Sequence, residues 1–169
     1  LIQSYIDQGL VINGIRPPVA AFLINNQAQN FGATKLRGID FDASYRWPTD
    51  FGDFDVSLTA SHVYRFDVQT TPLAPVVSQV GMITNPTRLR AQGILGWTRD
   101  GWGAEVTLNW ADAYINNQVT PAEKVDDYFT TDLHLGYTFE DSGSRWLNGT
   151  SLALDVSNVF DVDPPYVNI

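Results

Sequence analysis

The chain has 169 residues, and its 10 Lys and Arg against 19 Asp and Glu give a formal net charge of −9. This balance excludes a nucleic-acid-binding protein, which would gather basic side chains on one face to neutralise phosphates. Because the chain has no cysteine, disulfide scaffolds, cysteine zinc sites and thiol nucleophiles are excluded as well. The longest wholly apolar run, at residues 19–24, is far shorter than the roughly 20 residues of a membrane helix.

The glycine and aromatic content indicates a β-protein. The chain holds 13 Gly, 5 Trp, 7 Tyr and 9 Phe with only 17% charged residues. Glycine and aromatic side chains that punctuate many short segments are typical of all-β folds. At this length we expect one domain. The chain begins with Leu1 and shows no export signal, so we expect it to be part of a longer protein.

A period of two predicts six strands. From residue 38 to 47, apolar side chains alternate with polar ones. The apolar positions are Ile39, Phe41, Ala43, Tyr45 and Trp47, and the polar positions are Asp40, Asp42, Ser44 and Arg46. The same alternation recurs at residues 53–67, 88–98, 102–110, 129–139 and 152–157. This is the period of a β-strand with one apolar and one polar face, and no comparable run has helical spacing.

Short and long connections alternate along the chain. The segments 47–54, 97–102 and 140–150 are short or turn-like and rich in Gly and Asp. Residues 69–87 and 116–127 are longer, less patterned segments that contain prolines. A meander with short turns on one side and long loops on the other is typical of a transmembrane β-barrel, in which the short turns face the periplasm.

Strand length and aromatic position favour the same fold. The apolar face of the second segment runs from Phe54 to Phe66, which exceeds the roughly 9–11 residues that a tilted strand needs to cross the hydrocarbon. Aromatic rings concentrate near strand ends, as in the girdles at headgroup level, and the polar face would line a wet lumen. The alternative is a soluble sandwich, but its strands usually have about five or six residues and its core requires no girdles. The aromatic residues concerned are Tyr45, Trp47, Phe54, Tyr64, Phe66, Trp97, Trp102, Trp110, Tyr114, Tyr137 and Phe139.

Three stretches resemble the C-terminal part of TonB-dependent outer-membrane receptors. Residues 30–45 are similar to the family's Asn, followed by Gly-(Val/Ile)-(Glu/Asp) and an alternating strand. Residues 124–139 resemble a strand that the family writes as Tyr, then (Thr/Val)-Asp-Leu, then Tyr and Phe. Residues 152–167 resemble the near-terminal Asn-(Leu/Val)-Phe-Asp motif and the Pro-Pro-(Phe/Tyr) that follows it. The resemblance covers nearly the whole chain.

This resemblance implies an all-β, antiparallel up-and-down meander that is a fragment of a plugged transmembrane barrel of about 22 strands. Residues 1–169 would be the C-terminal part of the barrel, without the plug domain and the last strands. The whole protein would be an active-transport receptor in the outer membrane of a Gram-negative bacterium, for a scarce nutrient such as a ferric siderophore. Its partners would be outer-membrane lipid, the plug, the TonB complex and a small-molecule ligand. No catalysis, cofactor or metal is implied.

Two sets of residues are candidates for function. Outward loops carry recognition on a rigid barrel, and rings beside amide donors suit sugars, siderophores or cobalamin. The loop candidates are Tyr114, Asn116, Asn117, Gln118 and Tyr166. The residues predicted to face the lumen are Asp40, Asp42, Arg46, Asp53, Asp55, Arg65, Arg88, Arg90, Asp132 and Asp155. These could contact a plug or a passing ligand, and we expect them to form cross-strand ion pairs that hold the register.

The two histidines predict no catalytic or metal site. His62 falls on the apolar phase of its segment and His134 on the polar phase, so the two rings point to opposite faces. Ser61 lies next to His62, but adjacent strand residues face opposite ways, so the ring cannot activate the hydroxyl.

The remaining polar motifs have simple structural interpretations. Asp126 and Asp127 are interpreted as a solvated acidic loop. Asp161 and Asp163 lack the rest of a calcium-loop signature. The sequon that begins at Asn148 is interpreted as a turn.

Two other functions stay open at this point. One is a passive outer-membrane channel without a plug, which a signal peptide directly upstream would indicate. The other is a secreted soluble β domain that binds glycans, which would fold as a monomer without detergent.

Overall fold

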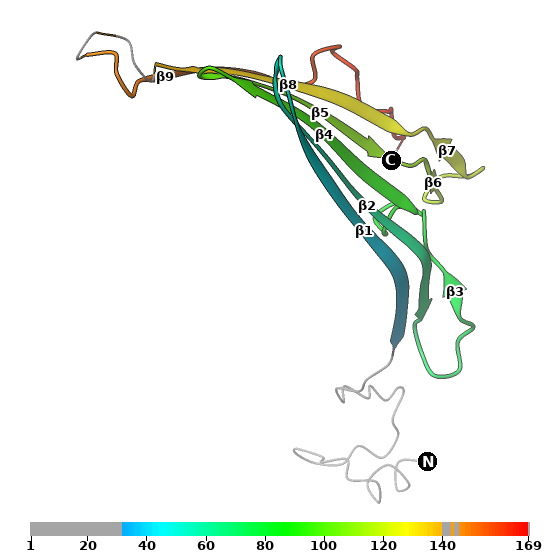
Figure 1. The fold of residues 1–169 in the computed structure, drawn as a ribbon. Helices are drawn as coiled ribbons and strands as arrows, with labels where there is room; N and C mark the ends of the chain where they lie inside the picture. Colours follow the sequence, from blue (N-terminus) through cyan, green and yellow to red (C-terminus); the bar gives the residue numbers. More distant parts are fainter. Residues whose placement is uncertain (1–31, 140–142, 144–145, 169) are drawn as a thin grey trace, which may run out of the picture. The chain divides into compact units, whose positions relative to one another are not determined.

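The computed structural model describes residues 32–139, 143 and 146–168 (Figure 1). The apolar run at 19–24, the first residues of the motif at 30–45 and part of the segment 140–150 lie outside this range. The described residues form strands, and no helix among them is long and apolar enough to cross a membrane. The strands are β1 (Ala33–Thr49), β2 (Gly52–Gln69), β3 (Val77–Ser78), β4 (Leu89–Arg99), β5 (Trp102–Ala111), β6 (Tyr114–Asn116), β7 (Glu123–Val125), β8 (Tyr128–Thr138) and β9 (Ser151–Val156).

One antiparallel sheet contains most of the strands. Its order is β1-β2-β4-β5-β8-β9, so each long strand lies beside the next long strand along the chain. The short strand β3 pairs with the end of β2, and β6 and β7 form a separate hairpin. The predicted all-β meander is confirmed. Its first strand begins at Ala33, before the predicted start, because β2 extends to Gln69 and pairs with it across a register shift between Arg37 and Gly38.

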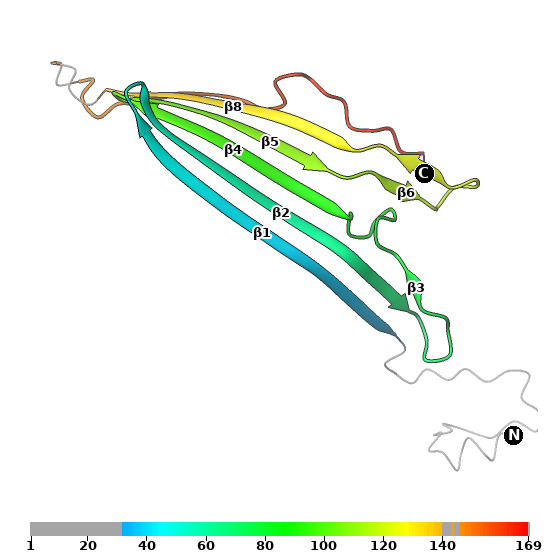
Figure 2. The same ribbon diagram turned by 45° about the vertical axis from the view of Figure 1, so that its right-hand side comes forward.

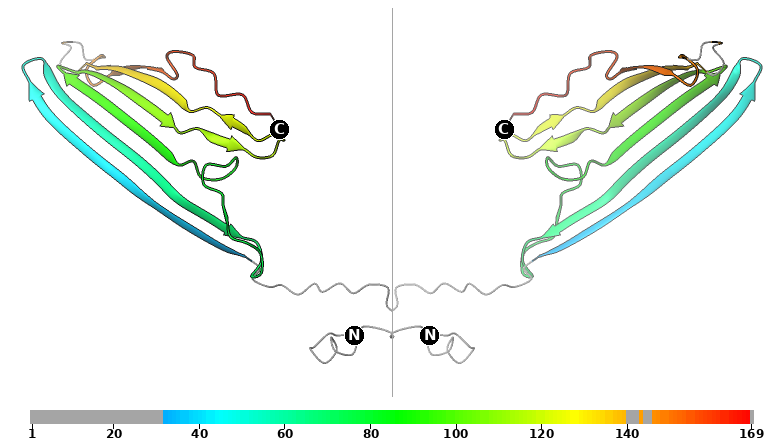
Figure 3. Two further views of the ribbon diagram at one scale, coloured as in Figure 1. Left: turned by 90° about the vertical axis from the view of Figure 1, so that its right-hand side faces the viewer. Right: turned by 90° about the vertical axis from the view of Figure 1, so that its left-hand side faces the viewer.

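The two ends of the sheet differ in their connections (Figure 2). The β1–β2 and β4–β5 turns and the β8–β9 connection lie at one end, which we call the short-turn end. The strands β3, β6 and β7 and the end of the chain lie at the other, the long-loop end (Figure 3). The predicted alternation of short and long connections is therefore confirmed. The long segments are more ordered than predicted, since β3 lies in the first and β7 lies in the second, where it pairs with β6.

The sheet is a single layer with two unlike faces. Register places apolar side chains of successive strands opposite one another; one such row is Tyr45, Val56, Leu95, Val106, Leu133 and Val156. Most side chains of this row stay exposed, with Tyr45 at 67%, and so does Ile39 on the same face at 64%, whereas Val106 is half-buried. Among the described residues, only Val80 and Val125 are buried apolar side chains, and both lie at the long-loop end. A sandwich would cover its apolar face with a second sheet, and the described strands provide none.

Candidate functional site

The apolar face carries stacked aromatic side chains at the short-turn end. Trp47 stacks on Tyr45 at 5.7 Å and on Phe54 at 5.6 Å between ring centroids. Tyr137 contacts Trp102 at 4.6 Å and Phe139 at 4.8 Å. The two groups lie on opposite sides of β4, so rings extend along this edge of the sheet from β1 to β8.

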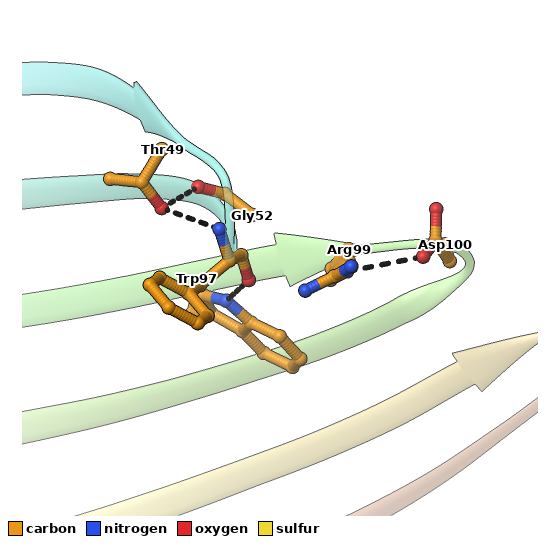
Figure 4. Close-up of polar contacts among 6 residues, drawn as sticks. Thr49, Gly52, Trp97, Arg99 and Asp100 are labelled. Carbon is orange, nitrogen blue, oxygen red and sulfur yellow. Dashed lines mark hydrogen bonds and ion pairs between the residues drawn. The ribbon is translucent and has the colours of Figure 1, made fainter.

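Another tryptophan ties two turns together at this end (Figure 4). The Trp97 indole N–H donates to the Phe51 carbonyl oxygen at 2.9 Å. Within the β1–β2 turn, the Thr49 hydroxyl donates to the Gly52 carbonyl at 2.7 Å and accepts from the Phe51 N–H at 3.1 Å. In the neighbouring turn, Asp100 and Gly101 have φ of 47° and 80°, the left-handed pair that a two-residue hairpin loop requires.

The spacing of the aromatic rings matches a membrane thickness. On β5, Trp102 lies at the short-turn end, and Trp110 lies opposite Phe129 toward the long-loop end. Eight residues of antiparallel strand span about 27 Å, or about 20 Å across a bilayer at the tilt of barrel strands. The apolar band of outer-membrane barrels is about 25 Å tall and is flanked by aromatic girdles. The apolar face therefore has the dimensions of a lipid-facing surface.

The polar face is held by hydrogen bonds between neighbouring strands. The Thr59 hydroxyl donates to Asp42 at 2.9 Å, and the Ser61 hydroxyl donates to Asp40 at 2.7 Å. On the next strands, the Gln92 amide donates to Asn109 at 2.8 Å. This face therefore uses hydroxyl and amide groups to satisfy its carboxylates.

Asp132 connects the sheet to the segment that follows β9. It accepts from the Asn109 side chain at 2.9 Å and from the Asn158 backbone N–H at 2.8 Å. Asn158 in turn makes two hydrogen bonds with Val162. The Asn158 side-chain amide donates to the Val162 carbonyl at 3.0 Å, and the Val162 backbone N–H donates to Asn158 Oδ1 at 3.1 Å. Two motifs that carried the family resemblance thus contact each other, and their conspicuous Asp and Asn are structural partners.

The predicted cross-strand pairing of carboxylates with arginines is wrong for the described part of the chain. Arg65 pairs with Asp67 on its own strand at 2.5 Å. Arg46 and Asp55 are register partners but form no ion pair. The Asp55 carboxylate instead covers Gly96, where an added Cβ would lie 2.5 Å from Oδ1.

The other predicted lumen arginines lie near the long-loop end. Arg88 lies against Gly81, whose added Cβ would be 3.1 Å from Nε. Arg90 donates from Nε to the Thr87 hydroxyl at 3.0 Å. Asp53 faces Thr98 across the β2–β4 pair, and Asp155 faces His134 across β8–β9.

Three segments of chain meet at the long-loop end. The Ile83 N–H donates to the Ile115 carbonyl at 2.8 Å, and the Ile115 N–H donates to the Gly81 carbonyl at 2.8 Å. Asn116 is fully buried, and its side-chain amide donates to the Asn168 carbonyl at 2.6 Å and accepts from the Gln118 N–H at 3.0 Å. The loop after β2, the β6–β7 hairpin and the C-terminal segment therefore form one cluster, which we call the loop cluster.

The loop candidates divide into two kinds within this cluster. Both polar ends of the Asn116 side chain are bonded to the protein, so this residue positions the loops. Asn117 and Gln118 are exposed, Tyr114 is half-buried, and Tyr166 is 86% exposed on the C-terminal segment. Amide groups that bond to no acceptor among the described residues, and an open ring, are suited to contact a ligand.

The acidic loop residues next to β8 each bond to one nearby side chain. The Trp110 indole donates to Asp127 at 2.9 Å, and this hydrogen bond lowers the pKa of the Asp127 carboxyl. Asp126 pairs with Lys124 at 3.1 Å. No group of three potential metal ligands occurs among the described residues.

The sequence matches a model of one protein family over residues 2–159, described as TonB dependent receptor-like, beta-barrel. The chain belongs to this family. TonB-dependent receptors are outer-membrane receptors of Gram-negative bacteria that carry out active transport, and the complete proteins have a plug domain and interact with TonB. They are transporters and receptors and not a family of enzymes. No curated protein and no solved structure matches the chain.

The two histidines of this TonB-dependent receptor chain lie on different strands. His62 is on β2 in an apolar row opposite Ile39 and Leu89, with its ring against Tyr64. His134 is on β8, and its Nδ1 lies 2.6 Å from Asp155. Two strands, β4 and β5, separate them. Sequence reasoning did not single out Gln92, Asn109 or Tyr128 on the polar face, although the period of two already placed Gln92 and Asn109 there.

Proposed function

We propose that this chain forms part of the wall of a plugged TonB-dependent receptor, with residues 1–169 all belonging to the barrel. Its apolar face contacts outer-membrane lipid, and its polar face lines the lumen and meets the plug. The observation that carries this proposal is the single-layer sheet, whose continuous apolar rows stay exposed while the opposite face forms a hydrogen-bonded polar surface. Lipid stabilises such an apolar face, and water solvates such a polar one.

The connections give the orientation in the membrane. Outer-membrane barrels have short turns on the periplasmic side and longer loops outside. The short-turn end therefore faces the periplasm, and the loop cluster faces the medium. The stacked rings Tyr45, Trp47 and Phe54 would then lie at the inner headgroup level.

The transported ligand is proposed to be a scarce nutrient, such as a ferric siderophore. Tyr166, Asn117 and Gln118 present an open ring and unburied amides above a loop cluster whose core is buried. A positioned loop surface lowers the ordering cost of binding. The ligand's energy-dependent passage would require the plug and the TonB complex.

Single-cysteine labelling tests the orientation, because the chain has no cysteine of its own. Leu73 is 98% exposed between β2 and β3, and Asp50 is exposed in the β1–β2 turn, so L73C and D50C are matched probes at opposite ends. With a membrane-impermeant maleimide, we expect intact cells to be labelled at L73C only, and at both positions after the outer membrane is permeabilised. Labelling of D50C in intact cells would contradict the orientation.

An uptake assay tests the ligand. A strain without the gene should lose TonB-dependent accumulation of radioactive iron carried by at least one class of siderophore, either hydroxamate or catecholate. Restoring the gene with Tyr166→Ala should raise the concentration needed for half-maximal uptake, with the receptor still present in the outer membrane. Unchanged uptake of both classes in the deletion strain would contradict a receptor for hydroxamate or catecholate siderophores.

A further inference from the structure

We propose that the polar face contains a binding site for a planar carboxylate, centred on Arg90 near the long-loop end. This inference deepens the proposed function and rests on the polar face being the lumenal one. The site is a hollow of about 390 Å³ in the surface of β4, β5 and β8. The residues that line it on this face include Arg90, Gln92, Asn109, Ala111, Tyr128 and Thr130.

Register creates the hollow. Arg90, Ala111 and Tyr128 lie in one row across β4, β5 and β8. The small Ala111 side chain forms the floor, and the two long side chains form opposite walls. Neighbouring strands are about 4.8 Å apart, so the two walls rise from backbones about 10 Å apart. That separation fits one planar group between a guanidinium and a phenol ring.

The charge of the hollow is unusual for this chain. The protein has 19 acidic residues against 10 basic ones, yet the lining of this hollow contains Arg90 and no Asp or Glu. A second hollow, of about 240 Å³, has Arg90 on its other side together with Ser61, Val63, Pro86 and Thr87, again without an acidic residue. Arg90 thus stands between two hollows whose linings carry no negative charge.

The neighbouring hydrogen bonds leave the Arg90 guanidinium available. Its Nε donates to Thr87 at 3.0 Å, and among the described residues no carboxylate lies within 4.0 Å of it. Two carboxylates of the polar face are already bonded elsewhere: Ser61 donates to Asp40, and Asn109 donates to Asp132. The two terminal nitrogens of an arginine form a fork that matches a carboxylate.

The Tyr128 wall adds a flat surface for the same ligand. The Tyr128 hydroxyl donates to the Val162 carbonyl at 3.2 Å, which directs the side chain toward the C-terminal segment. At the next row of the sheet, the Gln92 amide is bonded to Asn109 and the Asn109 amide to Asp132. The wall residues are therefore positioned without a ligand, and an aromatic or conjugated carboxylate could pair with Arg90 and stack on Tyr128.

The carboxylate could belong to a transported molecule or to a side chain of the plug, and the experiment separates these sources. The full-length receptor in detergent micelles would be titrated with 4-fluorobenzoate, monitored by fluorine NMR, with neutral 4-fluorobenzamide as the matched ligand. R90Q is the test variant. R99Q is its control, since Arg99 lies in the short-turn end and pairs with Asp100. Y128L removes the ring, and Y128F keeps it.

For a site open to free ligands, we expect saturable binding of the benzoate but not of the amide. R90Q should weaken it about tenfold, equivalent to about 1.4 kcal/mol, Y128L should weaken it less, and R99Q and Y128F should leave it unchanged. If a plug carboxylate occupies the hollow, the benzoate will not bind, but R90Q will lower the thermal unfolding temperature of the receptor relative to R99Q. Both results support the carboxylate site and assign its source.

Two results would overturn the proposal. One is equal binding of the benzoate and the amide, or benzoate binding that R90Q leaves unchanged. The other is the absence of binding together with equal unfolding temperatures for R90Q and R99Q. Because neither measurement involves transport, a receptor that binds the benzoate but takes up no ferric siderophore would contradict the proposed ligand and leave this site in place.

Discussion

The two ends of the sheet are built in different ways. At the short-turn end, glycines and left-handed residues close two-residue turns, and aromatic rings stack side by side on an exposed face. At the long-loop end, three separate segments meet, and Asn116, Val80 and Val125 are buried among them. Tight turn geometry, joined by contacts between adjacent strands, shapes the first end, whereas contacts among three loop segments shape the second. Substitutions should therefore act locally through turn strain at one end and across several loops at the other.

The largest expected effect comes from turn geometry at the short-turn end. Gly101 has φ of 80°, and an added Cβ would lie 2.5 Å from the Thr138 carbonyl oxygen. Gly101→Ala should lower the free energy of unfolding by about 2 kcal/mol or more, since it adds left-handed strain and a backbone clash. Urea-induced unfolding in lipid vesicles measures it. The control is Gly103→Ala, because nothing lies within 4 Å of an added Cβ there; equal losses for the two variants would contradict the turn-strain explanation.

The next effect tests the long-range character of the other end. Asn116→Ala removes the hydrogen bonds to Asn168 and Gln118 from a fully buried site. The free energy of local unfolding of the loop cluster should therefore fall by about 1–2 kcal/mol. Hydrogen exchange should become faster at the paired amides of Ile83 and Ile115, which belong to different segments. The exposed neighbour variant Asn117→Ala should leave those amides protected. Faster exchange confined to the β6–β7 hairpin would show that the segments do not act together.

A third prediction isolates one hydrogen bond at the short-turn end. Trp97→Phe removes the indole donor to Phe51, while Trp47→Phe removes a similar ring area from a tryptophan that stacks on Tyr45 and Phe54 and whose indole bonds to no acceptor among the described residues. The free energy of unfolding should be about 1 kcal/mol lower for Trp97→Phe than for Trp47→Phe, because one hydrogen bond usually contributes about that much. Denaturant titration of both variants under one condition gives the difference. A larger loss for Trp47→Phe would mean that ring packing dominates.

The smallest effect concerns pH at the long-loop end. The Trp110 indole lowers the pKa of Asp127 from its ordinary value of 3.8. A depressed pKa contributes stability that is present above the ordinary value and is lost as the pH falls through the folded-state pKa. In Asp127→Asn, the free energy of unfolding should therefore fall slightly less at acid pH than in the unchanged protein. In Trp110→Phe, the pKa of Asp127, measured by carbon NMR, should rise. An unchanged titration in Trp110→Phe would exclude the indole as the cause.

Alternation in the sequence predicted the strands of the main sheet because each residue's direction follows from a local period of two. Leu58 and Thr59, for example, lie on the apolar and polar faces as that period requires. The extension of β1 to Ala33 was not predicted, because it depends on the length of its partner β2 and on a register shift at Gly38. The β6–β7 hairpin was missed since its strands, Tyr114–Asn116 and Glu123–Val125, have only 3 residues each.

The sequence alone determined the class of this protein: a period of two, aromatic rings at strand ends and alternating connection lengths all depend on local residue order, and the family match agrees with them. Only the tertiary structure decided which polar groups meet. The carboxylates bond to hydroxyls and amides where arginines were predicted, and Arg90, Ala111 and Tyr128 form one hollow although their order in the chain does not indicate it. Register across several strands sets such neighbours, and register depends on every turn between them.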